Sequence, residues 1–389
     1  KTNLKSEILE TREGQEANDI LRSCVHCGFC TATCPTYQLL GDELDSPRGR
    51  IYLIKELLEG KTPTQATQLH LDRCLTCRSC ETTCPSGVQY GRLVDIGRHI
   101  VDKAVPRSIG DQVKRQALNK IITNKTLFRS LITAGKIVKP VLPKALQKKI
   151  PERHKTIMTW PQSNHTRKML FLDGCVQPIL APNINIATAR LLDRIGVTLI
   201  PTSSVNCCGA VTYHLNKQKE SLVFIKQNID AWWPFVEQGA EAIVITASGC
   251  GTMIKEYGYL LAEDPNYAEK AKIISELAKD LCEVFDDELA DLKQQILDPI
   301  KEKQMASRRI AFHSPCSLQH GQQIKGLVES LLKTAGYTLT IIEDSHLCCG
   351  SAVTYSLLQA DLSEQLLDKK IEAIEKEEPD LIVTANIGC

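Results

Sequence analysis

Eight cysteines within the first quarter of the chain recur with one spacing, and no other feature of the sequence constrains the fold as strongly. They form two runs of the pattern C-x2-C-x2-C-x3-C followed by proline. The runs are Cys24, Cys27, Cys30 and Cys34 before Pro35, and Cys74, Cys77, Cys80 and Cys84 before Pro85. Three thiols spaced two residues apart wrap a tight loop around one site, whereas the fourth lies beyond that loop. We therefore expect the two runs to fold against each other.

This spacing is typical of proteins that hold two [4Fe–4S] clusters, in which the fourth cysteine of each run ligates the other cluster. We assign two such clusters. The ligands of the first are Cys24, Cys27, Cys30 and Cys84, and those of the second are Cys74, Cys77, Cys80 and Cys34. The alternatives are zinc and disulfides, but zinc sites usually use separate C-x2-C pairs.

Composition bears on the compartment. The 389 residues are 43% hydrophobic and 24% charged, as expected for two or three globular domains. Seventeen cysteines are too few for a disulfide scaffold in a chain of this length, and their clustering favours metal in a reducing compartment. We find neither an apolar run of about 18 residues nor a signal peptide. We expect a cytoplasmic protein, peripheral on the cytoplasmic face of the inner membrane.

Positive charge is concentrated in residues 98–155, where fifteen Lys or Arg side chains face three Asp or Glu. This stretch is either a solvated helical face or a docking surface for an acidic subunit or anionic lipid. Lys114, Arg115, Lys148 and Lys149 are the candidate contacts. Nucleic acid is not expected, because the stretch has few aromatic residues and matches no binding motif.

Helical spacing of apolar residues predicts a helix over residues 47–60, between the two cysteine runs, and a second helix over 90–103. A helix at this place indicates an α-helical ferredoxin domain, which we assign to residues 1–103. Residues 104–165 then form a basic helical connector interrupted by prolines.

The rest of the chain is an internal repeat. Four cysteines of its first copy recur about 140 residues later in the second copy. The copies contain Cys175, Cys207, Cys208 and Cys250, and Cys316, Cys348, Cys349 and Cys389. We place the repeats at residues 166–306 and 307–389. Alternating strands and helices predict two α/β domains with mainly parallel sheets, and the cysteines follow the carboxyl ends of strands, where such folds build their sites.

Matched recurrence of four thiols favours a third cluster or a zinc ion in at least one repeat. The alternative is buried structural cysteine, which is how we interpret Cys282, since it matches neither pattern. The repeats resemble the cysteine-rich CCG domains of heterodisulfide reductase and anaerobic glycerol-3-phosphate dehydrogenase. The full CCG motif ends in Cys-x-x-Cys, whereas Met253 takes the last position in the first repeat and Cys389 is the last residue of the chain. We expect the natural chain to continue beyond Cys389.

The order of parts resembles the iron–sulfur subunit of bacterial glycolate oxidase over essentially the whole chain. The stretches that carry this resemblance are Cys24–Tyr37, Asp45–Tyr52, Asn228–Pro234 and Ser345–Gly350. The resemblance implies an FAD-containing partner subunit that oxidises the 2-hydroxy acid, a second FAD-binding-type subunit, and electron transfer towards the membrane quinone pool. We find no dinucleotide fingerprint and no catalytic nucleophile, so we name no catalytic residue in this chain. The alternatives are the iron–sulfur subunit of a D-lactate or glycerol-3-phosphate dehydrogenase, and a zinc-stabilised scaffold.

Overall fold

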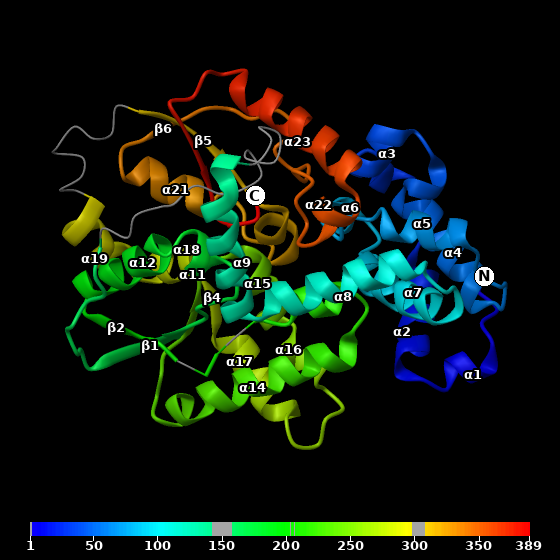
Figure 1. The fold of residues 1–389 in the computed structure, drawn as a ribbon, viewed down its shortest axis with the longest axis horizontal. Helices are drawn as coiled ribbons and strands as arrows, with labels where there is room; N and C mark the ends of the chain where they lie inside the picture. The colour runs from blue at the N-terminus through cyan, green and yellow to red at the C-terminus, as the bar shows by residue number, and fades with distance from the viewer. Residues whose placement is uncertain (1, 142–157, 203, 206, 298–307) are drawn as a thin grey trace.

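The computed structural model describes residues 2–141, 158–202, 204–205, 207–297 and 308–389, whose arrangement is shown in Figure 1. The first part of the chain is helical, which confirms the predicted fold class. Its helices are α1 (Ser6–Leu9), α2 (Arg12–Ser23), α3 (Pro35–Leu40), α4 (Pro47–Leu58), α5 (Gln65–Asp72), α6 (Ser79–Thr83) and α7 (Tyr90–Ala104), with the short 3-10 turns η1 (Phe29–Thr31) and η2 (Glu43–Asp45).

The predicted helix between the cysteine runs is α4, and it packs against α7. Its first turn is capped by Ser46, whose side chain accepts a hydrogen bond from the Gly49 N–H at 2.9 Å. Gly97 lets α7 approach α4 closely, because a Cβ at this position would lie 2.6 Å from Cγ1 of Ile54. The apolar faces of the two helices therefore join in one core, to which cysteines of both runs contribute.

Two helices follow α7 in the connector, α8 (Ile109–Thr123) and α9 (Lys125–Val138), and the turn η3 (Lys139–Val141) comes next. They meet at Asn124, whose side chain accepts a hydrogen bond from the Leu127 N–H at 2.9 Å and caps α9. Lys148 and Lys149 lie outside the described residues. Arg115 is not a free surface cation, because it binds Asp72 at 3.1 Å and Asp111 at 2.9 Å.

The first repeat contains a sheet of parallel strands in the order β2-β1-β3-β4. The strands are β1 (Arg167–Phe171), β2 (Val197–Ile200), β3 (Ile243–Ile245) and β4 (Ala278–Asp280). Successive residues of β3 face opposite sides: Ile243 and Ile245 belong to one core, and Val244 belongs to the other. Apolar packing on both faces is the pattern expected of a parallel sheet covered by helices.

Helices surround this sheet on both sides in Figure 1. They are α11 (Gln177–Leu180), α12 (Asn183–Arg194), α13 (Ala210–His214), α14 (Gln218–Glu237), α15 (Ser248–Lys255), α16 (Tyr257–Leu260), α17 (Ala268–Leu277), α18 (Leu281–Asp287) and α19 (Leu289–Leu292), followed by the π-helical turn η4 (Lys293–Leu297). Trp232 of α14 is fully buried in the core on one face, and Leu192 of α12 is fully buried in the core on the other.

The second repeat has the same topology in a smaller sheet, with parallel strands in the order β6-β5-β7. Its elements are β5 (Arg309–His313), the π-helical turn η6 (Ser317–Gly321), α21 (Leu327–Thr334), β6 (Thr338–Leu339), α22 (Tyr355–Leu358), α23 (Ala360–Glu375) and β7 (Leu381–Thr384). In the part of this repeat that the structure describes, β7 has no further strand beside it like β4. The repeat and its parallel sheets are as predicted.

The helical part contacts both repeats. Arg78 binds Glu256 of the first repeat at 2.5 Å, and Thr82 bonds His320 of the second repeat at 2.8 Å. The domain limits at residues 103, 165 and 306 remain predictions. Among the described helices, none has the length and apolar character needed to cross a membrane.

Candidate metal centres

The two cysteine runs line two cavities, and each cavity takes thiols from both runs. The first is lined by Cys24, Cys27, Cys30, Cys80 and Cys84, and the second by Cys34, Cys74, Cys77 and Cys80. The fourth cysteine of each run therefore lies with the first three of the other run. Four thiols around a cavity are the donor set of a [4Fe–4S] cluster, so these residues fit two such clusters.

The loops of the two runs have the same backbone conformation. His26 and Gly28 in the first run have φ of 53° and 87°, and the matching Thr76 and Arg78 in the second run have 53° and 60°. Three of these four residues are not glycine, and the left-handed region costs such residues energy. Because the same unfavourable backbone conformation occurs in both loops, we interpret it as the one that wraps the chain around a binding site.

Burial sets the protonation of these thiols in the absence of metal. It raises the pKa of Cys30 to about 11, and it raises the pKa of Cys77 and of Cys80 well above the ordinary range. A bound metal favours the thiolate instead, so these groups release protons when they bind metal.

Polar side chains that sequence reasoning missed contact the sulfurs of the second cavity. The Tyr90 hydroxyl donates to Cys74 Sγ at 3.6 Å, and Arg50 Nη1 lies 4.0 Å from Cys34 Sγ. Arg50 is 1% exposed and pairs with the fully buried Asp45 at 3.3 Å. The burial of Arg50 could have been predicted from the sequence, because Arg50 lies four residues before Ile54 and so shares the buried face of α4.

The thiols of the first repeat form a continuous set at the carboxyl end of the sheet. Cys175 follows β1, the pair Cys207 and Cys208 follows β2, and Cys250 lies in α15 after β3. Hydrogen bonds link Cys175 to Cys207, and Cys208 to both Cys207 and Cys250. Bonds from its neighbours hold the pKa of Cys207 well below the usual range.

The second repeat brings its four thiols together in the same order. Cys316 Sγ lies 3.7 Å from Cys348 Sγ, and the free thiol of Cys349 is hydrogen-bonded to those of Cys348 and Cys389. These bonds lower the pKa of Cys349. The glycine after each cysteine pair has a positive φ, and in the second repeat a Cβ at Gly350 would meet Ser363 O at 2.7 Å. The Cys-Cys-Gly sequence thus requires its glycine.

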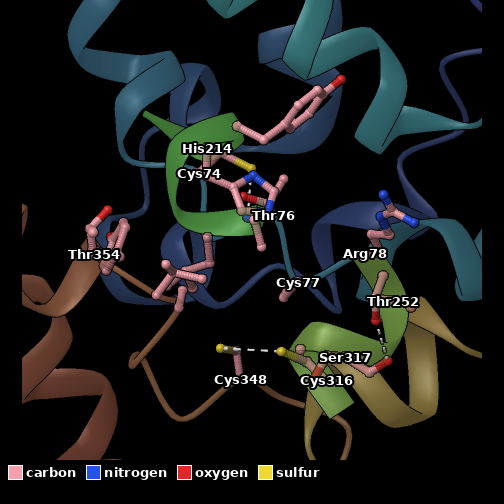
Figure 2. A pocket seen from close by; sticks show the side chains of 18 of the residues that line it. Cys74, Thr76, Cys77, Arg78, His214, Thr252, Cys316, Ser317, Cys348 and Thr354 are labelled. Atoms are coloured by element: carbon pink, nitrogen blue, oxygen red, sulfur yellow. Dashed lines mark hydrogen bonds between the residues drawn. The ribbon is translucent and has the colours of Figure 1, made fainter. Parts of the chain in front are cut away.

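The thiols of the second repeat adjoin the second cavity of the helical domain. A pocket between the helical part and both repeats is lined by Cys74 and Cys77 on one side and by Cys316, Cys348 and Cys389 on the other. Figure 2 shows Cys77 between Cys74 and the Cys316–Cys348 pair. Cys282 is buried at the start of α18 and packs in an apolar cluster with Phe312 and Leu318.

Comparisons with known proteins agree with this arrangement. Residues 20–88 match the 4Fe-4S dicluster domain family, and residues 169–255 and 310–389 both match the cysteine-rich domain family. The fold and the thiol sites thus define an iron–sulfur protein with a dicluster domain and two cysteine-rich segments.

Full-length relatives identify the particular family. The chain is 52% identical over 388 residues to the glycolate oxidase iron-sulfur subunit of Escherichia coli K12, covering 100% of this chain and 93% of the relative. It is 30% identical to the probable glycolate oxidase iron-sulfur subunit of Bacillus subtilis, covering 98% and 89%. Lactate utilization protein A of Anoxybacillus flavithermus is 28% identical but covers only 55% of this chain. The chain belongs to the family of glycolate oxidase iron–sulfur subunits, as the sequence motifs predicted.

Proposed function

We propose that this chain is the electron-transfer subunit of a flavin-dependent glycolate dehydrogenase that oxidises glycolate to glyoxylate. The supporting observation is a line of adjoining thiol sites. Cys80 and Tyr90 line both cavities of the helical domain, and Cys77 of the second cavity shares a pocket with Cys316. The first cavity reaches the surface at the exposed Cys27. A line of adjoining sites that reaches the surface at one end suits stepwise electron transfer.

A [4Fe–4S] cluster bound in each cavity supplies one-electron transfer, which divides the two-electron output of a flavin into single steps. The proposed ligands of the first cluster are Cys24, Cys27, Cys30 and Cys84, and those of the second are Cys74, Cys77, Cys80 and Cys34. The lining of the two cavities supports this assignment. The thiols would bind and orient each cluster, and the polar groups around the thiols would set the electrostatic field at the cluster.

The exchange of fourth ligands has a direct test. Cys34→Ser is expected to damage the cluster built on Cys74, Cys77 and Cys80, and to leave the other intact. Cys84→Ser is the matched control and is expected to have the reverse effect. EPR spectra of both reduced variants distinguish the clusters. If Cys34→Ser abolishes the signal of the Cys24 cluster and spares the second, the assignment is wrong.

The thiols of the cysteine-rich segments are proposed to hold metal as well, either a third cluster or zinc. Four thiols converge in each segment, which supports this proposal. The proposed ligands are Cys175, Cys207, Cys208 and Cys250, and Cys316, Cys348, Cys349 and Cys389. The content of iron, zinc and acid-labile sulfide per chain tests this proposal. Two [4Fe–4S] clusters alone account for eight iron atoms, so additional iron, or zinc, would indicate metal in the cysteine-rich segments.

The relatives' names support glycolate as the substrate and another glycolate oxidase subunit as a partner. We infer that an FAD-containing glycolate oxidase subunit and a second FAD-binding-type subunit bind this chain, and that the membrane quinone pool accepts the electrons. A D-lactate or glycerol-3-phosphate dehydrogenase subunit is the alternative, and partial similarity to lactate utilization protein A supports only a role with lactate.

Reconstitution with the flavoprotein subunits tests this inference. Glycolate is expected to reduce the clusters, as seen by bleaching of their visible absorbance, faster than D-lactate or glycerol-3-phosphate. Preferential reduction by either of the other substrates would refute the assignment. A protein without visible absorbance that contains only zinc would instead be a scaffold.

Peripheral attachment to the cytoplasmic face of the inner membrane is proposed through the connector. Lys114, Lys120 and Arg129 are exposed on α8 and α9. No side chain of α9 is buried, and Leu131 and Ile137 are 46% and 74% exposed. A basic helix with exposed aliphatic side chains is typical of contact with a membrane surface.

Charge reversal measures this attachment. Changing Lys114, Lys120 and Arg129 to Glu is expected to weaken binding to vesicles that contain anionic lipid, by about 1 kcal/mol for each basic residue near the surface. Arg115→Glu is not a suitable probe, because Arg115 pairs within the chain. Neutral vesicles are the control. Unchanged binding of the triple variant at low salt would show that this face is only solvated.

A further inference from the structure

The imidazole of His313 is buried without a conventional partner. His313 is the last residue of β5 and is 4% exposed. Among the described residues, neither ring nitrogen meets the geometry of a regular hydrogen bond, and the polar group that the ring interacts with is the Cys349 thiol. Buried polar groups are almost always satisfied, because an unmade hydrogen bond costs on the order of 1–3 kcal/mol. An unsatisfied imidazole at the end of a strand therefore calls for a ligand.

The ring lies among the thiols of the second cysteine-rich segment. A ring nitrogen of His313 and the Sγ atoms of Cys349 and Cys389 all lie within 4.8 Å of one another. Cys348 and Cys316 extend this group, with their sulfurs 3.7 Å apart. Two sulfurs that bind one tetrahedral metal at about 2.3 Å are separated by about 3.8 Å. One sulfur pair thus has the spacing expected of two ligands of one metal, and the imidazole lies with two further thiols of the same segment.

The first segment lacks this imidazole. The residue three positions before Cys316 is His313, whereas the residue three positions before Cys175 is Leu172. Leu172 is 4% exposed and packs in the apolar core of the first segment. The same strand end therefore carries an aliphatic side chain in one repeat and an unsatisfied nitrogen donor in the other.

A second buried histidine shows what a structural histidine looks like here. His320 is also 4% exposed, but its Nδ1 bonds the Thr82 hydroxyl at 2.8 Å and its Nε2 bonds the His346 carbonyl at 2.8 Å. Both of its nitrogens are used within the protein. The two histidines are equally buried, but only His320 has regular hydrogen-bond partners for both ring nitrogens.

We propose that His313 is a nitrogen ligand of the metal centre in the second cysteine-rich segment, together with Cys349, Cys389 and the thiols beside them. This inference rests on the proposed binding of metal by the thiols of that segment. Where the neutral imidazole takes a coordination position that one of these thiolates would otherwise fill, the centre carries one negative charge less. In iron–sulfur sites, histidine ligation raises the reduction potential. The centre that adjoins Cys77 would then be a stronger electron acceptor than an all-thiolate centre.

The test compares variants of the full chain in its complex. Metal analysis of the wild type first shows whether iron beyond that of the two clusters, or zinc, is present. His313→Leu, which copies the first segment, is expected to lose as much of that metal as Cys389→Ser. His313→Cys is expected to retain the metal. His320→Leu is the control and is expected to retain it too. The EPR signals of the two helical-domain clusters report whether the helical domain of each variant is intact, and circular dichroism compares the folding of the whole chain between variants.

Direct detection of the nitrogen completes the test. For iron, pulsed EPR of protein labelled with ¹⁵N-histidine is expected to show a nitrogen coupling that His313→Cys removes. For zinc, X-ray absorption is expected to lose its imidazole scattering in the same variant. Wild-type metal content and an unchanged nitrogen signal in the His313 variants would overturn the proposal. If only Cys389→Ser loses metal, His313 is not a ligand, but the thiols of this segment still bind metal. If neither variant loses metal, both the His313 ligand and the thiol site are rejected. The proposed electron transfer by the helical domain would still stand.

Discussion

Replacing Tyr90 with phenylalanine removes a single hydrogen bond to a proposed ligand of the second cluster. The Tyr90 side chain is 4% exposed, and its hydroxyl donates to Cys74 Sγ at 3.6 Å. Burial, with the nearby Cys74 thiol, raises the pKa of Tyr90 well above its usual range, so the phenol remains a donor at physiological pH. Phenylalanine keeps the ring and loses only the donor.

The expected effect is a lower reduction potential for the second cluster. Reduction adds negative charge, and a donor to the ligand sulfur stabilises that charge. A hydrogen bond to a charged group contributes about 1.5–3 kcal/mol. Because this bond is long and also present in the oxidised state, we expect a difference between the states of about 1 kcal/mol. For one electron this equals about 40 mV.

An EPR-monitored redox titration of the complex measures the shift. The potential of the second cluster should fall by tens of millivolts in Tyr90→Phe, and the potential of the first should change less. Tyr52→Phe is the matched control, because Tyr52 is 50% exposed on α4. A potential within error of the wild type, in a variant with full cluster content, would refute the reasoning.

Two further changes probe buried charges. Arg50→Met leaves Asp45 without one of its cations and should destabilise the helical domain by about 3 kcal/mol or more, measured by denaturant unfolding; an unchanged midpoint would mean that Arg73, 2.8 Å from Asp45, suffices. Burial raises the pKa of Asp95 to about 6, so ionisation of this group in the folded state costs stability as pH rises from about 4 to 6. Asp95→Asn should therefore stabilise the protein at pH 8 by about 1–2 kcal/mol, with the gain vanishing near pH 4. A pH-independent effect of this substitution would contradict that account.

Cysteine spacing predicted the meeting of the two runs, and the helical spacing of apolar residues between them predicted the helical domain, because both patterns are local properties with few geometric solutions. The recurrence of Cys175 at Cys316, and of the cysteine pairs, predicted two related α/β units. The alternation of apolar segments then predicted parallel strands, with the thiols at their carboxyl ends. All of these inferences depend on residues close in sequence or on repetition.

Contacts between distant segments were not predictable in this way. Arg50 reaches Cys34 across 16 residues, and Arg115 reaches Asp72 across 43, which removes Arg115 from the surface that its charge suggested. His313 looks ordinary in sequence. Its meaning depends on the folding of β5 beside β7, which brings it near Cys389.

One residue of a cysteine loop also connects the helical domain to the first repeat through an ion pair. Arg78 directly follows Cys77, and its side chain binds Glu256 of the first repeat at 2.5 Å. Displacement of that repeat would pull on the peptide next to a thiol that faces Cys316, with no linker to absorb the movement. Because electron tunnelling weakens steeply with separation, this arrangement leaves the spacing between neighbouring sites little slack. Arg78 therefore couples the position of the first repeat to the loop that carries Cys77.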